Sequence, residues 1–140
     1  MSRMLPPIGD VDDYAANNPF MAYNHIQITA VGEDANCDHY AEVSVELRPE
    51  SMNLRGAVHG GLLYGLADCV AGIAARCDGS DYVTQSAHIN FLRNTDHGTV
   101  FARAEVIRRG RHMAVIHVTV RDGEGRLLAD CAVDMMRTEA

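Results

Sequence analysis

The sequence contains no lysine and only four cysteines among its 140 residues, and both shortages exclude particular kinds of chemistry. All twelve basic residues are arginine, so catalysis through a lysine Schiff base is excluded, whereas binding of anions by planar guanidinium groups stays available. The cysteines are too few for a disulfide scaffold, and no two of them form a C-x-x-C pair. The first residues lack the apolar core of a signal peptide. We therefore expect a reduced, cytoplasmic protein.

Positive charge is also scarce, since nineteen acidic residues stand against twelve basic ones and give a formal net charge of −7. This balance argues against a nucleic-acid partner, which needs a basic face. A membrane partner is equally unexpected, because the mostly apolar residues 58–75 include Asp68, which would cost about 2.5–3.5 kcal/mol at the centre of a bilayer. With 47% hydrophobic and 22% charged residues, the composition is typical of one globular domain.

The pattern of apolar and polar residues predicts one helix among several strands. Residues 59–77 are apolar nearly all round, which is typical of a helix buried on every side. Short turns separate the last four of the predicted strands, so we expect those four to form an antiparallel meander. We divide the chain into a peripheral segment with a short helix, residues 1–23, and a single domain, residues 24–140. The predicted class is α+β, a curved antiparallel sheet wrapped around one central helix. The predicted strands are residues 25–31, 40–48, 82–92, 99–108, 112–121 and 126–136.

Asp68 is the only formally charged side chain between Arg55 and Arg76, and it lies within the predicted apolar helix. A carboxylate in such a place is costly unless it is hydrogen-bonded, paired or open to a wet cleft. A structural role, with a hydrogen bond from Tyr64, is the alternative to a catalytic one. A base acting near neutral pH must stay ionised, so we expect a donor within reach of Asp68 and take Thr84, on the following strand, as the candidate.

The start of the same helix carries His59, Gly60 and Gly61, where backbone N–H groups have no partner within the helix. Such donors can stabilise negative charge that develops on an oxygen atom, although the glycines could instead serve tight packing against a neighbouring backbone. Asn53 precedes them in a loop, where asparagine is usually a turn residue. Histidines and cysteines show no metal-ligand spacing, and no serine lies in a nucleophile elbow, so we expect neither a metal nor a cofactor.

Together these residues form a specific pattern that resembles the hotdog-fold acyl-coenzyme A thioesterases, in particular the phenylacetate-degradation (PaaI-like) branch. The similarity extends over about residues 24–138. It implies a helix wrapped by an antiparallel sheet, hydrolysis of a thioester to a free acid and coenzyme A (CoA), and a homodimer whose pairs join into a tetramer. CoA is then part of the substrate. The motifs that carry the resemblance are Asn53…Gly56-x-x-His59-Gly60-Gly61…Leu66-Ala67-Asp68, then Val83-Thr84, residues 88–92, Gly98 and Gly110-Arg111.

The resemblance also implies roles for individual residues at a site between two subunits. Asn53 and the backbone N–H of Gly60 would polarise the thioester carbonyl, with His59 beside them. Asp68 would come from the partner subunit and act either as a base or as a nucleophile, and Thr84 would help to hold the attacking water.

The remaining candidates concern substrate binding. Three arginines gather in one predicted turn and suit the phosphates of CoA, although a hairpin tip can also be charged merely because it is solvated. A non-catalytic hotdog protein that binds acyl-CoA as a regulator is the alternative function. The candidates for substrate binding are Gly61, Tyr64, Arg93, Arg108, Arg109, Gly110 and Arg111.

Overall fold

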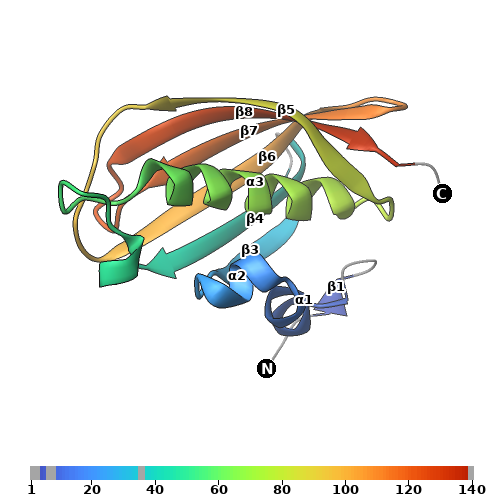
Figure 1. Cartoon of the computed structure of the whole chain (residues 1–140). Coiled ribbons are helices and arrows are strands. Elements are labelled where there is room, and N and C mark those ends of the chain that lie inside the picture. The colour runs from blue at the N-terminus through green and yellow to red at the C-terminus, as the bar shows by residue number, and fades with distance from the viewer. Residues whose placement is uncertain (1–3, 6–8, 35–36, 139–140) are drawn as a thin grey trace.

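In the computed structural model one long helix lies against the concave face of a single curved sheet (Figure 1). The structure describes residues 4–5, 9–34 and 37–138. Its helices are α1 Val11–Asn17, α2 Pro19–Tyr23 and α3 Gly60–Arg76, with a short 3-10 turn, η1, at Pro49–Ser51. Its strands are β1 Met4–Leu5, β2 Gly9–Asp10, β3 Gln27–Asp34, β4 Cys37–Glu46, β5 Tyr82–Phe91, β6 Thr99–Arg109, β7 Met113–Arg121 and β8 Leu127–Arg137.

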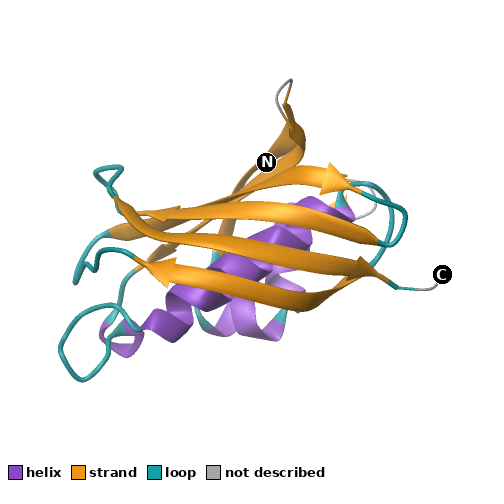
Figure 2. Cartoon of the chain, turned by 90° about the horizontal axis from the view of Figure 1, so that it is seen from above, coloured by secondary structure: helices purple, strands orange, loops and turns teal. Residues whose placement is uncertain are grey.

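The six long strands form one antiparallel sheet in the order β3-β4-β6-β7-β8-β5. Helix α3 runs along one face of this sheet, as the view from above shows (Figure 2). Strands β3 and β5 are the two edges, and α1 packs against β3. This arrangement confirms the predicted α+β class and the curved antiparallel sheet around one central helix.

The predicted four-stranded meander is wrong. Of its four strands, β5 to β8, only β6, β7 and β8 lie next to one another in chain order. Strand β5 pairs with β8 at the edge, and β6 pairs with β4 on the far side of β7. Residues 92–98 connect β5 to β6. An extended link of that length reaches about 23 Å, whereas the two intervening strands separate β5 from β6 by only about 14 Å. A short link therefore does not require the strands that it joins to be paired.

The core lies between α3 and the concave face of the sheet. Along β7 every second side chain, from Ala114 to Val120, is completely buried, which is the alternation of a strand with one covered face. Part of the segment predicted to be peripheral joins this core, since Met21 on α2 is only 1% exposed. The sheet covers one side of α3 alone, so the expectation that the helix is buried all round is wrong: Gly61 and Asp68 are exposed.

We expect Leu66→Ala to lower the free energy of unfolding by about 3–5 kcal/mol, because Leu66 is fully buried between α3 and the sheet and the truncation leaves a cavity. Leu54→Ala, in the exposed loop before α3, is the matched control and should change the free energy of unfolding by less than about 0.5 kcal/mol. Urea unfolding of both variants at one protein concentration measures the difference. Equal midpoints for the two variants would contradict the central position of α3.

Candidate active site

Helix α3 begins with an amide that is left free. The side chain of His59 caps the helix, and its Nδ1 accepts a hydrogen bond from the N–H of Gly61 at 2.8 Å. The carbonyl of His59 accepts the N–H groups of Leu62 and Leu63. Among the described residues nothing accepts the N–H of Gly60. This donor therefore lies at the positive end of the helix dipole and is available to a bound molecule.

Asn53 contributes a second free donor. Its Oδ1 accepts hydrogen bonds from the N–H groups of Arg55 at 2.8 Å and Ala57 at 3.2 Å, and these bonds close the loop before α3. Gly56 adopts a φ of +77° in the same loop, a conformation that favours glycine. Because Oδ1 already accepts two hydrogen bonds, Nδ2 is the group of the Asn53 side chain that can still bind a ligand. It has no acceptor in the part of the chain that the structure describes. Asn53 is therefore both a turn residue and a potential ligand.

Asn53 and Gly60 line the same cavity, which has a volume of about 330 Å³. Two free N–H donors on one cavity, one of them at a helix N-terminus, suit an oxygen atom that gains negative charge during a reaction. Arg93 also lines the cavity, whereas His59, Asp68 and Thr84 do not. Leu63 lines the cavity too. The remaining lining residues are Val58, Phe91, Leu92 and Asn94, none of which was predicted as a site residue, although the apolar pair Phe91-Leu92 at the end of a predicted strand was a usable signal.

The carboxylate of Asp68 is exposed and hydrogen-bonded on the outer side of α3. The hydroxyl of Thr84 donates to Asp68 Oδ1 at 2.6 Å, so the expectation of a donor within reach of Asp68 is confirmed. A register shift in β5 at Gln85 makes this contact possible. Ala87 and Ile89 face the helix beyond the shift, and without it strict alternation would turn Thr84 to the opposite face of the sheet.

Asp68 and the cavity lie apart within one chain. Asp68 follows Gly60 by eight residues, which is about 12 Å along the helix axis. Neighbouring Cys69 offers no substitute nucleophile, because burial, and then the charge of Asp68, raise the pKa of its thiol to about 12. The hydroxyl of Tyr64 donates to the carbonyl of Ala87 on β5 at 3.1 Å and so does not supply the structural bond to Asp68 that the sequence left open.

The glycines of α3 seat side chains, because within this chain the nearest atoms outside the helix backbone belong to side chains. A Cβ on Gly60 would lie 3.3 Å from the ring of Phe91, and one on Gly61 would lie 3.0 Å from His59. The place of a Cβ on Gly65 is only 2.6 Å from the ring of Phe20, and that on Gly72 is 2.6 Å from the guanidinium of Arg76. Each glycine therefore makes room for one side chain on the helix surface, which offsets part of its conformational cost.

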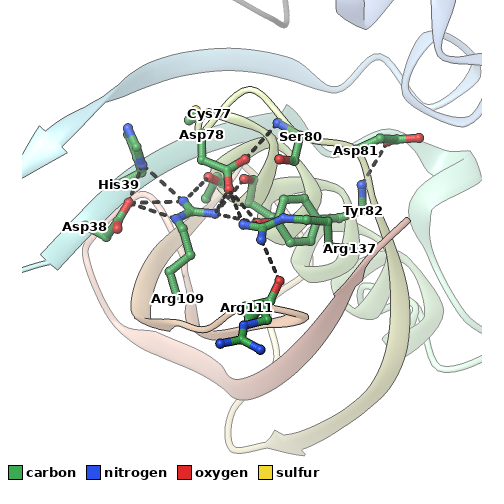
Figure 3. Close-up of polar contacts among 12 residues, drawn as sticks. Asp38, His39, Cys77, Asp78, Ser80, Asp81, Tyr82, Arg109, Arg111 and Arg137 are labelled. Atoms are coloured by element: carbon green, nitrogen blue, oxygen red, sulfur yellow. Dashed lines mark hydrogen bonds and ion pairs between the residues drawn. The ribbon is translucent and has the colours of Figure 1, made fainter. Parts of the chain in front are cut away.

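Arg109 lies at the other end of α3, inside a cluster of hydrogen bonds and ion pairs (Figure 3). Its guanidinium donates to the carbonyl of Ala75 at 2.9 Å and to the hydroxyl of Tyr82 at 3.0 Å. It also pairs with Asp38 and Asp78, both at 3.1 Å. Arg109 thus donates hydrogen bonds to carbonyl groups at the negative end of the helix. Its guanidinium is occupied by contacts within the chain and is not free to bind a phosphate.

The neighbours of Arg109 in the predicted turn are less engaged. Arg108 and Arg111 are exposed, and the N–H of Gly110 closes the turn by donating to the carbonyl of Met113 at 2.7 Å. Arg111 lines a second cavity, of about 480 Å³, together with His112 and Arg137. The predicted arginines therefore lie at two places, with Arg93 beside the first residues of α3 and the other three beside its last residues.

Two kinds of feature are absent from the described residues. No group of three or more histidine, cysteine, aspartate or glutamate side chains there could hold a metal ion. No helix in residues 4–5, 9–34 and 37–138 is both long and apolar enough to cross a membrane.

Comparison with known proteins agrees with this fold. The Thioesterase superfamily matches residues 55–129. A thioesterase from Haemophilus influenzae has a TM-score of 0.85, covering 98% of this chain and 96% of that one; at 23% identity the likeness concerns the fold. A variant of the phenylacetic acid degradation protein PaaI from Thermus thermophilus is 29% identical, with a TM-score of 0.78 over 86% of this chain and all of that one. A hypothetical thioesterase from Streptococcus pneumoniae, solved with coenzyme A, is 25% identical, with a TM-score of 0.73 over 81% and 85% of the two chains.

The curved antiparallel sheet around one central helix defines a protein of the hotdog-fold class, as the resemblance implied. The chain belongs to the Thioesterase superfamily, and PaaI proteins are among the structures that it resembles. It is a thioester hydrolase.

The cluster around Arg109 makes stability depend on pH. Burial acts to raise the pKa of Asp78, but hydrogen bonds from Tyr82, Ser80 and Arg137 outweigh it and hold the pKa below its ordinary value of 3.8. A carboxyl group whose pKa is lower in the folded than in the unfolded state contributes stability above its ordinary pKa and loses it as the pH falls through the folded pKa.

We therefore expect the free energy of unfolding to decline below about pH 4 in the wild type. Asp78→Asn should be less stable at neutral pH and should show a shallower decline in acid, because one of the groups that take up protons on unfolding is gone. Urea unfolding across this pH range measures both curves. Parallel curves for the two proteins would contradict the role of Asp78.

Proposed function

We propose that the protein hydrolyses acyl-CoA thioesters, with the thioester carbonyl oxygen bound between the Nδ2 of Asn53 and the N–H of Gly60. The observation that carries this proposal is the pair of free donors on one cavity at the start of α3. Losing one donor to a tetrahedral oxyanion typically costs about 2.7–4 kcal/mol of transition-state stabilisation. The relative from Streptococcus pneumoniae, solved with coenzyme A, supports CoA as the thiol part of the substrate.

The site is completed by a second copy of the chain. Strand β5 is an edge with exposed Val83 and Phe91, and an uncovered edge of this kind favours pairing with another strand. Antiparallel pairing of two β5 strands about a twofold axis also makes the two α3 helices antiparallel. The partner's Asp68 can then approach the cavity of the first chain. Within one chain, Asp68 stays about 12 Å from Gly60 along α3.

In this arrangement Asp68 acts on the carbonyl carbon. Either the carboxylate takes a proton from a water molecule that attacks the carbon, or it attacks directly and the resulting anhydride is hydrolysed by water. In the first case the carboxyl group returns this proton to the sulfur as the C–S bond breaks. In the second case the CoA leaves as a thiolate when the C–S bond breaks, and it takes up a proton released by the water that hydrolyses the anhydride. The hydroxyl of Thr84 orients the carboxylate, and His59, whose Nδ1 is engaged, presents Nε2–H towards the departing sulfur.

The same antiparallel pairing brings the turn at Arg111 of one chain towards the cavity of the other, because that turn lies at the last residues of α3. Exposed Arg108 and Arg111 then remain available for the CoA phosphates, whereas Arg109 supports the turn from inside.

Membership of the Thioesterase superfamily, together with the free donors and Asp68, favours an enzyme over a non-catalytic acyl-CoA-binding regulator. A dimer of dimers and a cytoplasmic location remain part of the proposal.

We expect Asp68→Asn to lower kcat for acyl-CoA hydrolysis by about 10²–10⁴-fold, because the amide can neither accept the proton nor attack. Asp134→Asn, on the opposite face of the sheet, is the matched control and should keep the wild-type kcat. Steady-state assays with a panel of acyl-CoA esters measure both. An unchanged kcat in Asp68→Asn would remove this residue from the mechanism.

Mixed dimers test whether the site is shared. A chain with Asp68→Asn and a chain with Asn53→Ala are co-expressed with different tags, and the mixed dimer is isolated. If Asn53 and Asp68 act across the interface, the mixed dimer has one intact site and recovers about half of the wild-type rate. If both residues act within one chain, no site is intact and the mixed dimer stays as inactive as its parents.

We expect Arg111→Ala to raise KM for CoA esters by about tenfold and to leave KM for the corresponding pantetheine thioesters unchanged, because only the CoA esters carry the nucleotide phosphates. Arg103→Ala, on the face of the sheet away from α3, should affect neither substrate. An equal rise in KM for both substrates would show that Arg111 does not bind phosphate.

A further inference from the structure

We propose that Phe20 on α2 determines acyl specificity, by bounding the space next to Asp68 that the acyl group of the substrate occupies. The inference rests on the proposed function. It adds a residue from the N-terminal segment, outside the pattern of loop, helix and strand residues from which the site was assembled.

The ring of Phe20 lies directly on α3. The place that a Cβ of Gly65 would take is 2.6 Å from Cζ and 2.9 Å from Cε2 of this ring, so only glycine at position 65 lets the ring rest there. The next residue on α2, Met21, is 1% exposed and belongs to the core, whereas Phe20 remains 44% exposed. The ring therefore packs on the helix with one side and presents the rest to the surroundings.

The position of Gly65 places this ring beside the reacting carboxylate. Gly65 and Asp68 are three residues apart on α3, a spacing that makes them neighbours on the helix surface, about 5–6 Å apart. Two hydrogen bonds close the side of this strip of α3, residues 61–68, that faces β5. The hydroxyl of Tyr64 donates to the carbonyl of Ala87, and the hydroxyl of Thr84 donates to Asp68. Phe20 reaches the same strip from α2. A group that lies along the strip next to Asp68 is thus bounded by β5 and by Phe20.

Hydrogen bonds within and around α2 hold the backbone of Phe20 in place. Asn18 caps the helix by accepting the N–H of Met21 at 3.1 Å, and Pro19 occupies the first turn. The side chain of Asn24 donates to the carbonyl of Phe20 itself at 3.0 Å. With its backbone anchored in this way and its ring packed on Gly65, Phe20 forms a wall beside this strip of α3. Because Asp68 must reach the carbonyl carbon, the acyl chain attached to that carbon has to fit against the wall, and its permitted size depends on the side chain at position 20.

The test compares kcat/KM for acetyl-, butyryl-, hexanoyl- and octanoyl-CoA. We expect Phe20→Ala to raise the octanoyl-to-acetyl ratio of kcat/KM by about tenfold or more, and Phe20→Leu to raise it less. Tyr23→Ala, an exposed aromatic residue on the same helix, is the matched control and should leave the ratio within about twofold of the wild type. An equal loss for all four esters in Phe20→Ala would mean a purely structural role and would overturn the inference.

A second measurement places the effect in the correct subunit. In the mixed dimer, the one intact site uses Asp68 from the chain that carries Asn53→Ala. Adding Phe20→Leu to that chain should change the acyl ratio, whereas adding it to the Asp68→Asn chain should not. The same ratio change from either chain, or from neither, would overturn the inference. If the wild type hydrolyses none of the esters, the proposed function itself fails, and that result is distinct from an unchanged ratio in an active variant.

Discussion

The curved sheet covers only one side of α3, and the rest of this structure depends on this constraint. The covered face of the helix carries Leu66 and its buried neighbours and holds the domain together. The uncovered face keeps Asp68 exposed, where it avoids the large cost of a buried charge. One helix therefore stabilises the fold with one side and carries, on the other, the carboxylate that we propose to be catalytic.

The two ends of α3 are treated in opposite ways. At the end of the helix, Arg109 donates to the carbonyl of Ala75 and joins a cluster that includes Asp78 and Tyr82 (Figure 3). At its start, the N–H of Gly60 has no acceptor among the residues that the structure describes. An unsatisfied amide at a helix N-terminus attracts negative charge, so this contrast separates a structural end of the helix from an end that can bind substrate.

Several features were predictable from local patterns in the sequence. Alternation of apolar and polar residues identified the long strands, and the apolar run at residues 59–77 identified α3, because both patterns are properties of neighbouring residues. The pairing of β5 with β8 was not predictable, since link length limits distance without selecting a neighbour. The orientation of Thr84 was equally hidden, because the register shift at Gln85 follows from pairing with β8 and leaves no clear mark in the sequence.

By itself, the sequence determined that Asp68, Asn53 and the glycines at positions 60 and 61 belong to one helix and the loop before it, since their spacing is covalent. Tertiary structure alone decided that Asn53 and Gly60 share a cavity, that Asp68 lies outside it, and that Gly65 seats Phe20. The physical reason is that residues 91–94 close the cavity and α2 supplies the ring of Phe20, so these relations depend on segments far from α3 in the chain. Packing of the whole sheet around α3 sets their distances, and local propensity carries no information about them.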